Sequence, residues 1–195
     1  MAESSYFIIF ITAILSGNMV FAKFLGLCPF FGITNKMEDA VGMGLAVICV
    51  QMVTVLLTWP LYHLVLLPLG LEVLKTMMFI LVIASCVQML EAIMKKITPK
   101  LYKNLGVFLP LITTNCIILG IALIIISEKL DFGRALWYAF CASLGFMFAL
   151  VLMTAIREKV KNAPIPKAIQ GAPLAFFIAT IISIAFIGFG GFVIN

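Results

Sequence analysis

Long apolar runs, separated by short polar stretches, dominate the hydrophobic pattern of this chain. A helix needs roughly 20 apolar residues to cross the hydrocarbon core of a bilayer, and each run is close to or above that length. The runs do not alternate between apolar and polar positions as barrel strands do, and an open sheet cannot satisfy its backbone in lipid. The pattern therefore predicts an all-α integral membrane protein with six transmembrane helices, at residues 6–33, 40–67, 76–94, 105–127, 135–156 and 172–194.

The composition agrees with a chain that lies almost wholly in the bilayer. Of its 195 residues, 64% are hydrophobic and only 11% are charged, whereas a soluble domain is about 45–50% apolar and about 25% charged. We expect a single membrane domain over residues 1–195, with no room for a soluble catalytic domain. The first apolar run lacks the preceding basic region of a secretory signal, so we expect it to be retained.

The positive charges predict the orientation of the chain. Lys and Arg are concentrated in the first, third and fifth gaps between runs, which the positive-inside rule places in the cytoplasm. Both termini are then extracytoplasmic. The net charge of +5 is thus an orientation signal, and we expect no nucleic-acid partner. The odd gaps hold Lys36, Lys95, Lys96, Lys100, Lys103, Arg157, Lys159, Lys161 and Lys167, and the even gaps hold Lys75, Lys129 and Arg134.

A weak internal repeat divides the chain into two halves of three helices. Cys28 to Gly32 and Cys116 to Gly120 both read Cys-x-x-x-Gly, and each follows an apolar stretch that contains Leu-Gly. Because three is odd, the second half must enter the membrane from the opposite side. The predicted organisation is therefore two inverted repeats, residues 1–100 and 101–195, a topology in which broken helices often form a site near the midplane.

The first and fourth runs both contain helix-breaking residues. As one helix the first would be about 42 Å long, against a hydrocarbon core of about 30 Å. It contains Gly17, Gly26, Pro29 and Gly32, and the fourth contains Pro110 followed by a polar stretch at 113–115. Two interpretations remain open, kinked helices or true half-helices. Counting along a continuous helix from Tyr6 also places Cys28 nearer the cytoplasm than Cys116, unless tilt or an outward extension corrects the depth.

Five cysteines lie inside the apolar runs, and their odd number argues against an extracellular disulfide framework. Cys28 and Cys116, approaching from opposite sides, can bind a soft metal or an iron–sulfur cluster, which normally needs four ligands, so a partner would supply the rest. The alternatives are two small buried hydrophobes or a disulfide between them. We interpret Cys49, Cys86 and Cys141 as buried packing residues.

Lys23 is the one basic residue inside an apolar run. It either offsets negative charge near Cys28 or extends its amine to the cytoplasmic interface. The sequence contains no Gly-x-Gly-x-x-Gly fingerprint and no phosphate-binding loop, so this chain is not expected to bind NAD or ATP.

Four segments, headed by the two cysteine motifs, resemble the A-type subunits of the Rnf complexes, the ion-translocating ferredoxin:NAD oxidoreductases of bacterial membranes. The resemblance covers essentially the whole chain. These subunits are similar to the E-type subunits of the sodium-translocating NADH:quinone oxidoreductases, and the Leu-Gly-Leu-Cys-Pro-Phe sequence matches the Rnf subunits better. The segments are Lys23 to Phe30, Gly42 to Ala46, Phe79 to Ala84 and Leu109 to Cys116.

The resemblance implies a function that the residues alone do not reach. In that family the homologous A-type and E-type subunits have opposite topologies, and four cysteines from the pair hold one intramembrane [2Fe–2S] cluster. The cluster relays electrons across the bacterial cytoplasmic membrane in a translocase coupled to Na⁺ or H⁺. The resemblance implies that Cys28 and Cys116 are two of the cluster ligands. It also implies that this chain has no complete active site and binds no flavin or NAD. Its partners would be the E-type subunit above all, then the subunits of types D, G, C and B. Lys23, Thr113, Thr114 and Asn115 would surround the cluster without ligating it.

Two alternatives to this function stay open. One is the E-type subunit of the sodium-translocating quinone reductase. The other is a component of a secondary transporter or permease with no redox role, because inverted repeats and broken helices suit it equally well. Iron content and a visible absorption spectrum distinguish the redox proteins from the transporter.

Overall fold

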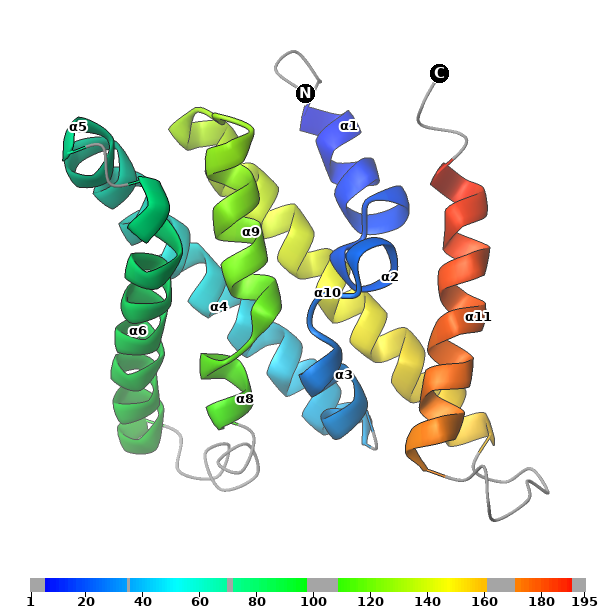
Figure 1. Ribbon diagram of the computed structural model, residues 1–195. Helices are drawn as coiled ribbons and strands as arrows, with labels where there is room; N and C mark the ends of the chain where they lie inside the picture. Colours follow the sequence, from blue (N-terminus) through cyan, green and yellow to red (C-terminus); the bar gives the residue numbers. More distant parts are fainter. Residues whose placement is uncertain (1–5, 35, 70–71, 98–108, 161–170, 191–195) are drawn as a thin grey trace.

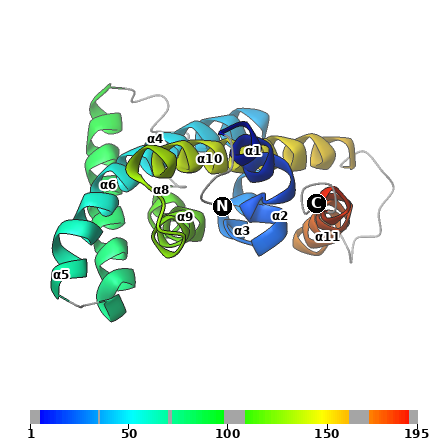
Figure 2. The same ribbon diagram turned by 90° about the horizontal axis from the view of Figure 1, so that it is seen from above.

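The computed structural model describes residues 6–34, 36–69, 72–97, 109–160 and 171–190, and all secondary structure within these ranges is helical. Two long helices, α4 (Met37–Leu61) and α10 (Phe132–Val160), pack against each other along their length and form one layer. Figure 2 shows α9 (Cys116–Ser127), α3 (Leu27–Ile33) and α11 (Ala172–Gly190) in a second layer, below α4 and α10 in that view. The other helices among the described residues are α1 (Tyr6–Ile11), α2 (Met19–Lys23), α5 (Leu67–Leu69), α6 (Lys75–Ile97) and α8 (Leu109–Thr113), with the short turns η1 (Thr12–Ser16), η2 (Tyr62–Leu66) and η3 (Glu72–Leu74).

Three helical segments within the described residues are long and apolar enough to cross a membrane, at Met37–Leu66, Lys75–Ile93 and Phe132–Val160. Three shorter apolar helices lie at Tyr6–Leu15, Leu111–Ser127 and Pro173–Phe186. The all-helical membrane architecture is therefore confirmed, and the count of six spans stays a prediction. The predicted residues 105–108 and 191–194 lie outside the described ranges.

The long helices extend beyond the predicted apolar runs into charged residues. Helix α4 begins with Glu38 and Asp39 in its first turn, and α10 ends with Arg157 and Lys159 in its last turn. Carboxylates near a helix N-terminus and cations near a C-terminus interact favourably with the helix dipole, so the helical conformation continues past the apolar residues.

The connections alternate between two ends of the molecule. Figure 1 shows the start of α1 and the end of α11 at one end, together with the end of α9. The end of α3, the end of α6 and the end of α10 lie at the opposite end. The residues that flank the three lysine- and arginine-rich gaps therefore share one end, as the charge pattern predicts.

The central pair α4 and α10 approaches closely because a glycine faces a side chain. A Cβ atom added at Gly44 would lie 2.6 Å from Cγ and 2.9 Å from Cβ of Met147. Small residues at such a crossing bring helix backbones together, which is the main source of helix association in lipid.

The first predicted span is divided by two interruptions. It consists of α1 (Tyr6–Ile11) with the π-helical turn η1 (Thr12–Ser16), then α2 (Met19–Lys23), then α3 (Leu27–Ile33). At the first interruption Asn18 caps α2 by accepting a hydrogen bond from the Val20 N–H, and its Nδ2 donates to the carbonyl oxygen of Gly145 at 2.9 Å. These bonds satisfy backbone groups that the break exposes, as lipid requires.

The second interruption, between α2 and α3, has a left-handed backbone. Phe24 and Gly26 adopt left-handed conformations, with φ of 54° and 80°. Pro29 does not break α3, because it lies in the first turn, where its missing N–H would have no helical partner. Of the helix breakers in this run, Gly17 and Gly26 lie at the interruptions, whereas Pro29 and Gly32 lie inside α3.

The fourth predicted span is also divided. Helix α8 ends at Thr113, and α9 begins at Cys116 after a turn at Thr114 and Asn115. Asn115 caps α9, because its Oδ1 accepts from the Ile117 N–H at 3.3 Å. Both spans are thus interrupted helices rather than continuous kinked ones.

Candidate intramembrane cysteine site

Cys28 and Cys116 each lie in the first turn of a helix that follows an interruption. Cys28 is the second residue of α3, and Cys116 is the first residue of α9. Figure 1 shows these two helices running in opposite directions from the breaks, α3 toward the lower end and α9 toward the upper end. Each break therefore places one thiol at the N-terminus of a helix.

A hydrogen bond joins the two breaks. The backbone N–H of Gly26 donates to Sγ of Cys116 at 2.9 Å, two residues before Cys28. The count that placed Cys28 nearer the cytoplasm than Cys116 does not hold, because it treated residues 6–33 as one helix and the chain leaves the helical path twice. The bond places Cys116 beside the break that precedes Cys28, although the two cysteines are 88 residues apart in the sequence.

Close packing surrounds the two breaks. A Cβ added at Gly120 would lie 2.7 Å from Cδ1 of Leu25, and one added at Gly26 would lie 2.9 Å from the ring of Phe146. Gly120, the glycine of the second Cys-x-x-x-Gly motif, therefore leaves room for the Leu25 side chain. Gly32, its counterpart in the first half, has no atom within 4 Å of an added Cβ. The two motifs share the cysteine position but not the role of the glycine.

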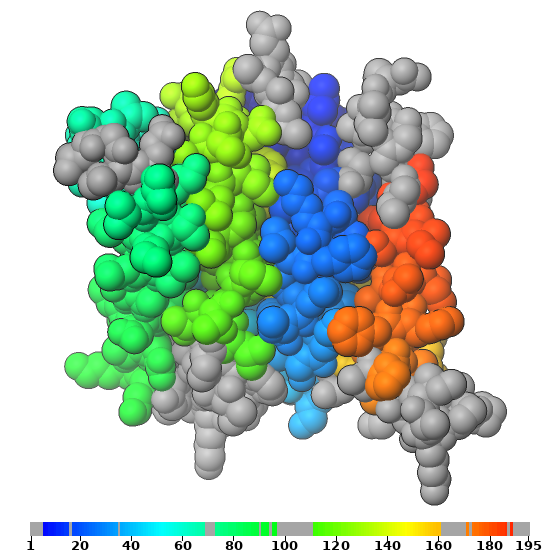
Figure 3. All heavy atoms as spheres, viewed as in Figure 1, coloured from blue at the N-terminus to red at the C-terminus, as the bar shows by residue number. Residues whose placement is uncertain are grey.

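The cysteine site lies at the surface of this chain. The side chain of Cys28 is exposed and that of Cys116 is partly exposed. Figure 3 shows α2 and α3 beside α8 and α9 at the centre of one face, between α6 and α11. Within the described residues there is no group of three or more His, Cys, Asp or Glu side chains that could hold a metal ion. The side chains of Cys28 and Cys116 are therefore accessible at the surface of this chain.

Arg157 fixes the far end of the helix that carries Cys28. Its Nη1 donates to the carbonyl oxygen of Phe31 at 3.1 Å and to Oγ1 of Thr34 at 2.8 Å. A cation at the C-terminus of a helix satisfies its free carbonyl groups and interacts favourably with its dipole. The sequence analysis missed this role, because it counted Arg157 only as an orientation charge.

Comparison with known proteins identifies the family. A family model described as "Rnf-Nqr subunit, membrane protein" matches residues 6–193. The chain belongs to the Rnf-Nqr family of membrane subunits. Three relatives are each named as the A-type subunit of an ion-translocating oxidoreductase complex. The relative from Syntrophotalea carbinolica is 48% identical, with 95% of this chain and 96% of the relative covered. Those from Hahella chejuensis and Yersinia enterocolitica are each 45% identical, with 97% of this chain and 98% of the relative covered.

The resemblance drawn from the sequence is therefore confirmed at the level of the Rnf-Nqr family. The matched residues include both interrupted spans and every residue that the sequence analysis selected.

Three further residues predicted to surround the site lie at the break between α8 and α9 of this Rnf-Nqr protein. Asn115 is buried, and its Nδ2 has no hydrogen-bond partner among the described residues. Thr113 ends α8, and Thr114 lies in the turn that precedes Asn115. Their position next to Cys116 in the chain agrees with the prediction, which otherwise stays untested.

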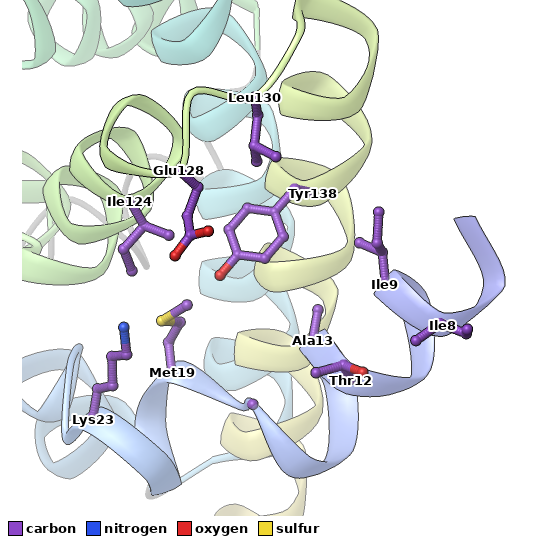
Figure 4. A pocket seen from close by; sticks show the side chains of 11 residues that line it. Ile8, Ile9, Thr12, Ala13, Met19, Lys23, Ile124, Glu128, Leu130 and Tyr138 are labelled. Carbon is purple, nitrogen blue, oxygen red and sulfur yellow. The ribbon is translucent and has the colours of Figure 1, made fainter. Parts of the chain in front are cut away.

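The side chain of Lys23 extends into a cavity. It lines a volume of about 300 Å³ between the first break, α9 and α10, together with Glu128 and Tyr138. Figure 4 shows its amine pointing into this cavity toward Glu128, which follows α9 at the end of the molecule opposite the lysine- and arginine-rich gaps. Both interpretations of Lys23, charge compensation near Cys28 and extension to the interface, stay predictions.

The three remaining cysteines divide into two groups. Cys86 and Cys141 are buried, which confirms their interpretation as packing residues. Cys49 is exposed, so the prediction that it is buried is wrong. The buried side of α4 follows Val47, Val50 and Gln51, and Cys49 falls on the opposite side of that helix.

Proposed function

We propose that this chain is the A-type membrane subunit of an ion-translocating ferredoxin:NAD oxidoreductase, and that Cys28 and Cys116 are two of the four ligands of an intramembrane [2Fe–2S] cluster. The observation that carries the proposal is the Gly26 N–H bond to Sγ of Cys116, which joins the two interrupted spans. The printed names of the relatives support the assignment to the complex.

The residues at the breaks fit half of such a cluster. A [2Fe–2S] cluster normally has four thiolate ligands, and its sulfur atoms accept hydrogen bonds from nearby backbone N–H groups. This chain offers two thiols, one of which already accepts such a bond. Cys116 also begins a helix of 12 residues, and the positive end of a helix dipole interacts favourably with a nearby negative charge such as that of a bound cluster.

The cluster, when bound, supplies one-electron transfer within the bilayer. The chain holds its two ligands rigidly from opposite half-helices, and it leaves their face open for a partner. We infer that the partner is the homologous E-type subunit in the opposite orientation, which would contribute the other two thiolates. The subunits of types D, G, C and B would provide the flavin, NAD and ferredoxin sites that this chain lacks, with electron transfer coupled to Na⁺ or H⁺.

The proposed architecture is six spans in two inverted repeats. The pattern of packing supports it, because each interrupted span lies against a long helix of the other half. Helices α1, η1 and α2 contact α10, whereas α9 contacts α4. Similarly, α11 contacts η1 and α2, whereas α6 contacts α8 and α9.

We predict that both termini are extracytoplasmic in the bacterial cytoplasmic membrane. At Ser5 and at Asn195, a fused reporter that works only outside the cytoplasm should be active, and a fused reporter that works only in the cytoplasm should be inactive. The positive-inside distribution is the reason, with most Lys and Arg in the odd gaps. A cytoplasmic reporter active at either end would contradict the six-span arrangement.

The shared cluster predicts that this chain expressed alone retains little iron. Co-expression with the homologous membrane protein should give a coloured complex with about two irons per pair, because two thiolates per chain do not complete the ligand set. Iron analysis and a visible spectrum of both preparations provide the measurement. A full cluster in the isolated chain would refute the shared site, and a colourless, iron-free complex would favour the transporter alternative.

A further inference from the structure

Helix α4 carries two buried polar side chains with no hydrogen-bond partners. Both polar atoms of Gln51, Oε1 and Nε2, lack a partner among the described residues, and so does Oγ1 of Thr54. Each side chain is 0% exposed. The two residues are three positions apart in one helix, so they lie on the same face. Helix α4 packs against α10, α6 and α9.

Buried polar groups such as these need a partner. An unpaired polar group in a membrane interior costs several kcal/mol, and buried polar groups in native proteins nearly always have a partner. The hydroxyls of neighbouring buried residues follow this rule. Thr58 Oγ1 donates to the carbonyl oxygen of Thr54 at 2.8 Å, and Thr154 Oγ1 donates to that of Leu150 at 2.8 Å. Gln51 and Thr54 are therefore the exceptions on α4.

We propose that Gln51 and Thr54 form a binding site for a small monovalent cation inside this protein. Amide and hydroxyl oxygens are ligands that hard cations prefer. Oε1 of Gln51 and Oγ1 of Thr54 would contact the cation, and a water retained by the cation would accept from Nε2. The site rests on the proposed function, because it provides the ion-translocating complex with an oxygen site for its ion. The ion is Na⁺ or hydronium, which share this oxygen chemistry.

Neighbouring residues of α10 contact the cysteine site and helix α4. Gly26, next to Cys116, faces the ring of Phe146, and Gly44 of α4 faces Met147, the following residue of α10. Gln51 is seven residues beyond Gly44 in α4, or about 10 Å along a helix with a rise of 1.5 Å per residue.

The test compares three variants in the purified whole complex. Thr54→Val and Gln51→Met keep the side-chain size but remove the free oxygens, and Thr58→Val is the matched control because the Thr58 hydroxyl already has a partner. One arm titrates Na⁺ at fixed pH, measuring ²²Na⁺ binding and the melting temperature. The other arm varies the pH without alkali cations and measures the melting temperature.

We expect the half-saturating Na⁺ concentration, or the midpoint of the pH profile if hydronium is the ion, to shift at least tenfold in Thr54→Val and Gln51→Met. The control should match the unmodified complex. If both arms are unchanged in the two site variants, a buried water alone occupies the site and the proposal is wrong. The visible spectrum separates this outcome from failure of the proposed function, because the cysteines remain intact in every variant.

A variant that fails to assemble does not end the test. Thr54→Ser keeps the hydroxyl and removes only a methyl group, so its Na⁺ or pH response should remain within about threefold of the unmodified complex. A tenfold shift in Thr54→Ser would indicate that packing, not the oxygen ligand, determines the response, and would overturn the proposal.

Discussion

Replacement of Cys28 or Cys116 by Ser is expected to abolish the cluster signal and ferredoxin-dependent NAD reduction in the assembled complex. The oxygen of Ser is a harder ligand than a thiolate and holds iron–sulfur clusters less well. Assembly should persist, because both cysteines lie in short breaks whereas the helices associate through long apolar surfaces such as the α4–α10 contact. An absorption spectrum, an electron paramagnetic resonance spectrum and the overall activity should be measured on one purified preparation.

The controls for this prediction are the other cysteines. Cys86→Ala and Cys141→Ala remove buried sulfur atoms and should leave the cluster intact, at a packing cost on the order of 1 kcal/mol. Cys49→Ala, at an exposed position, should cost less still. NADH oxidation by an artificial acceptor should continue in all variants, since that reaction belongs to other subunits. Electron transfer that survives without the cluster signal would disprove the relay role, and loss of the signal in a control would show that the ligands were wrongly chosen.

Replacement of Arg157 by Gln should loosen the helix that carries Cys28. The substitution removes the guanidinium hydrogen bonds to the Phe31 carbonyl oxygen and to Thr34. Hydrogen bonds from a charged donor contribute about 1.5–3 kcal/mol each. Helix α3 has only seven residues, so we expect it to move relative to α9 when this anchor is lost. The thiol of Cys28 should react faster with a maleimide in the iron-free chain, and the cluster spectrum of the complex should broaden.

Two further variants determine whether Arg157 acts through position or through charge. Arg157→Lys keeps the positive charge but lacks the planar fork that reaches two acceptors, so it should restore the Cys28 reaction rate only in part. Lys159→Gln removes an exposed cation two residues away and should leave that rate unchanged. Equal reaction rates in Arg157→Gln and in the unmodified chain would contradict the anchoring role.

The sequence by itself determined that this is a helical membrane protein, and it indicated the positions of the helix breaks and the family. Apolar runs near 20 residues without alternation indicate membrane helices, because only helices and closed barrels satisfy a backbone in lipid and barrel strands alternate. Gly17, Gly26 and the polar stretch at 113–115 predicted the breaks, since glycine and capping side chains end helices by local chemistry. The two cysteine motifs predicted the family, which the comparison confirms.

The tertiary structure alone decided how the breaks meet. The bond from Gly26 to Cys116 joins residues 90 positions apart, and no local pattern encodes it. The direction of Lys23, the exposure of Cys49 and the contact of Arg157 with α3 likewise depend on which helices are neighbours. The sequence shows which residues are apolar. In lipid, however, burial follows helix–helix packing rather than polarity, so only the arrangement of the helices shows which face of each is covered.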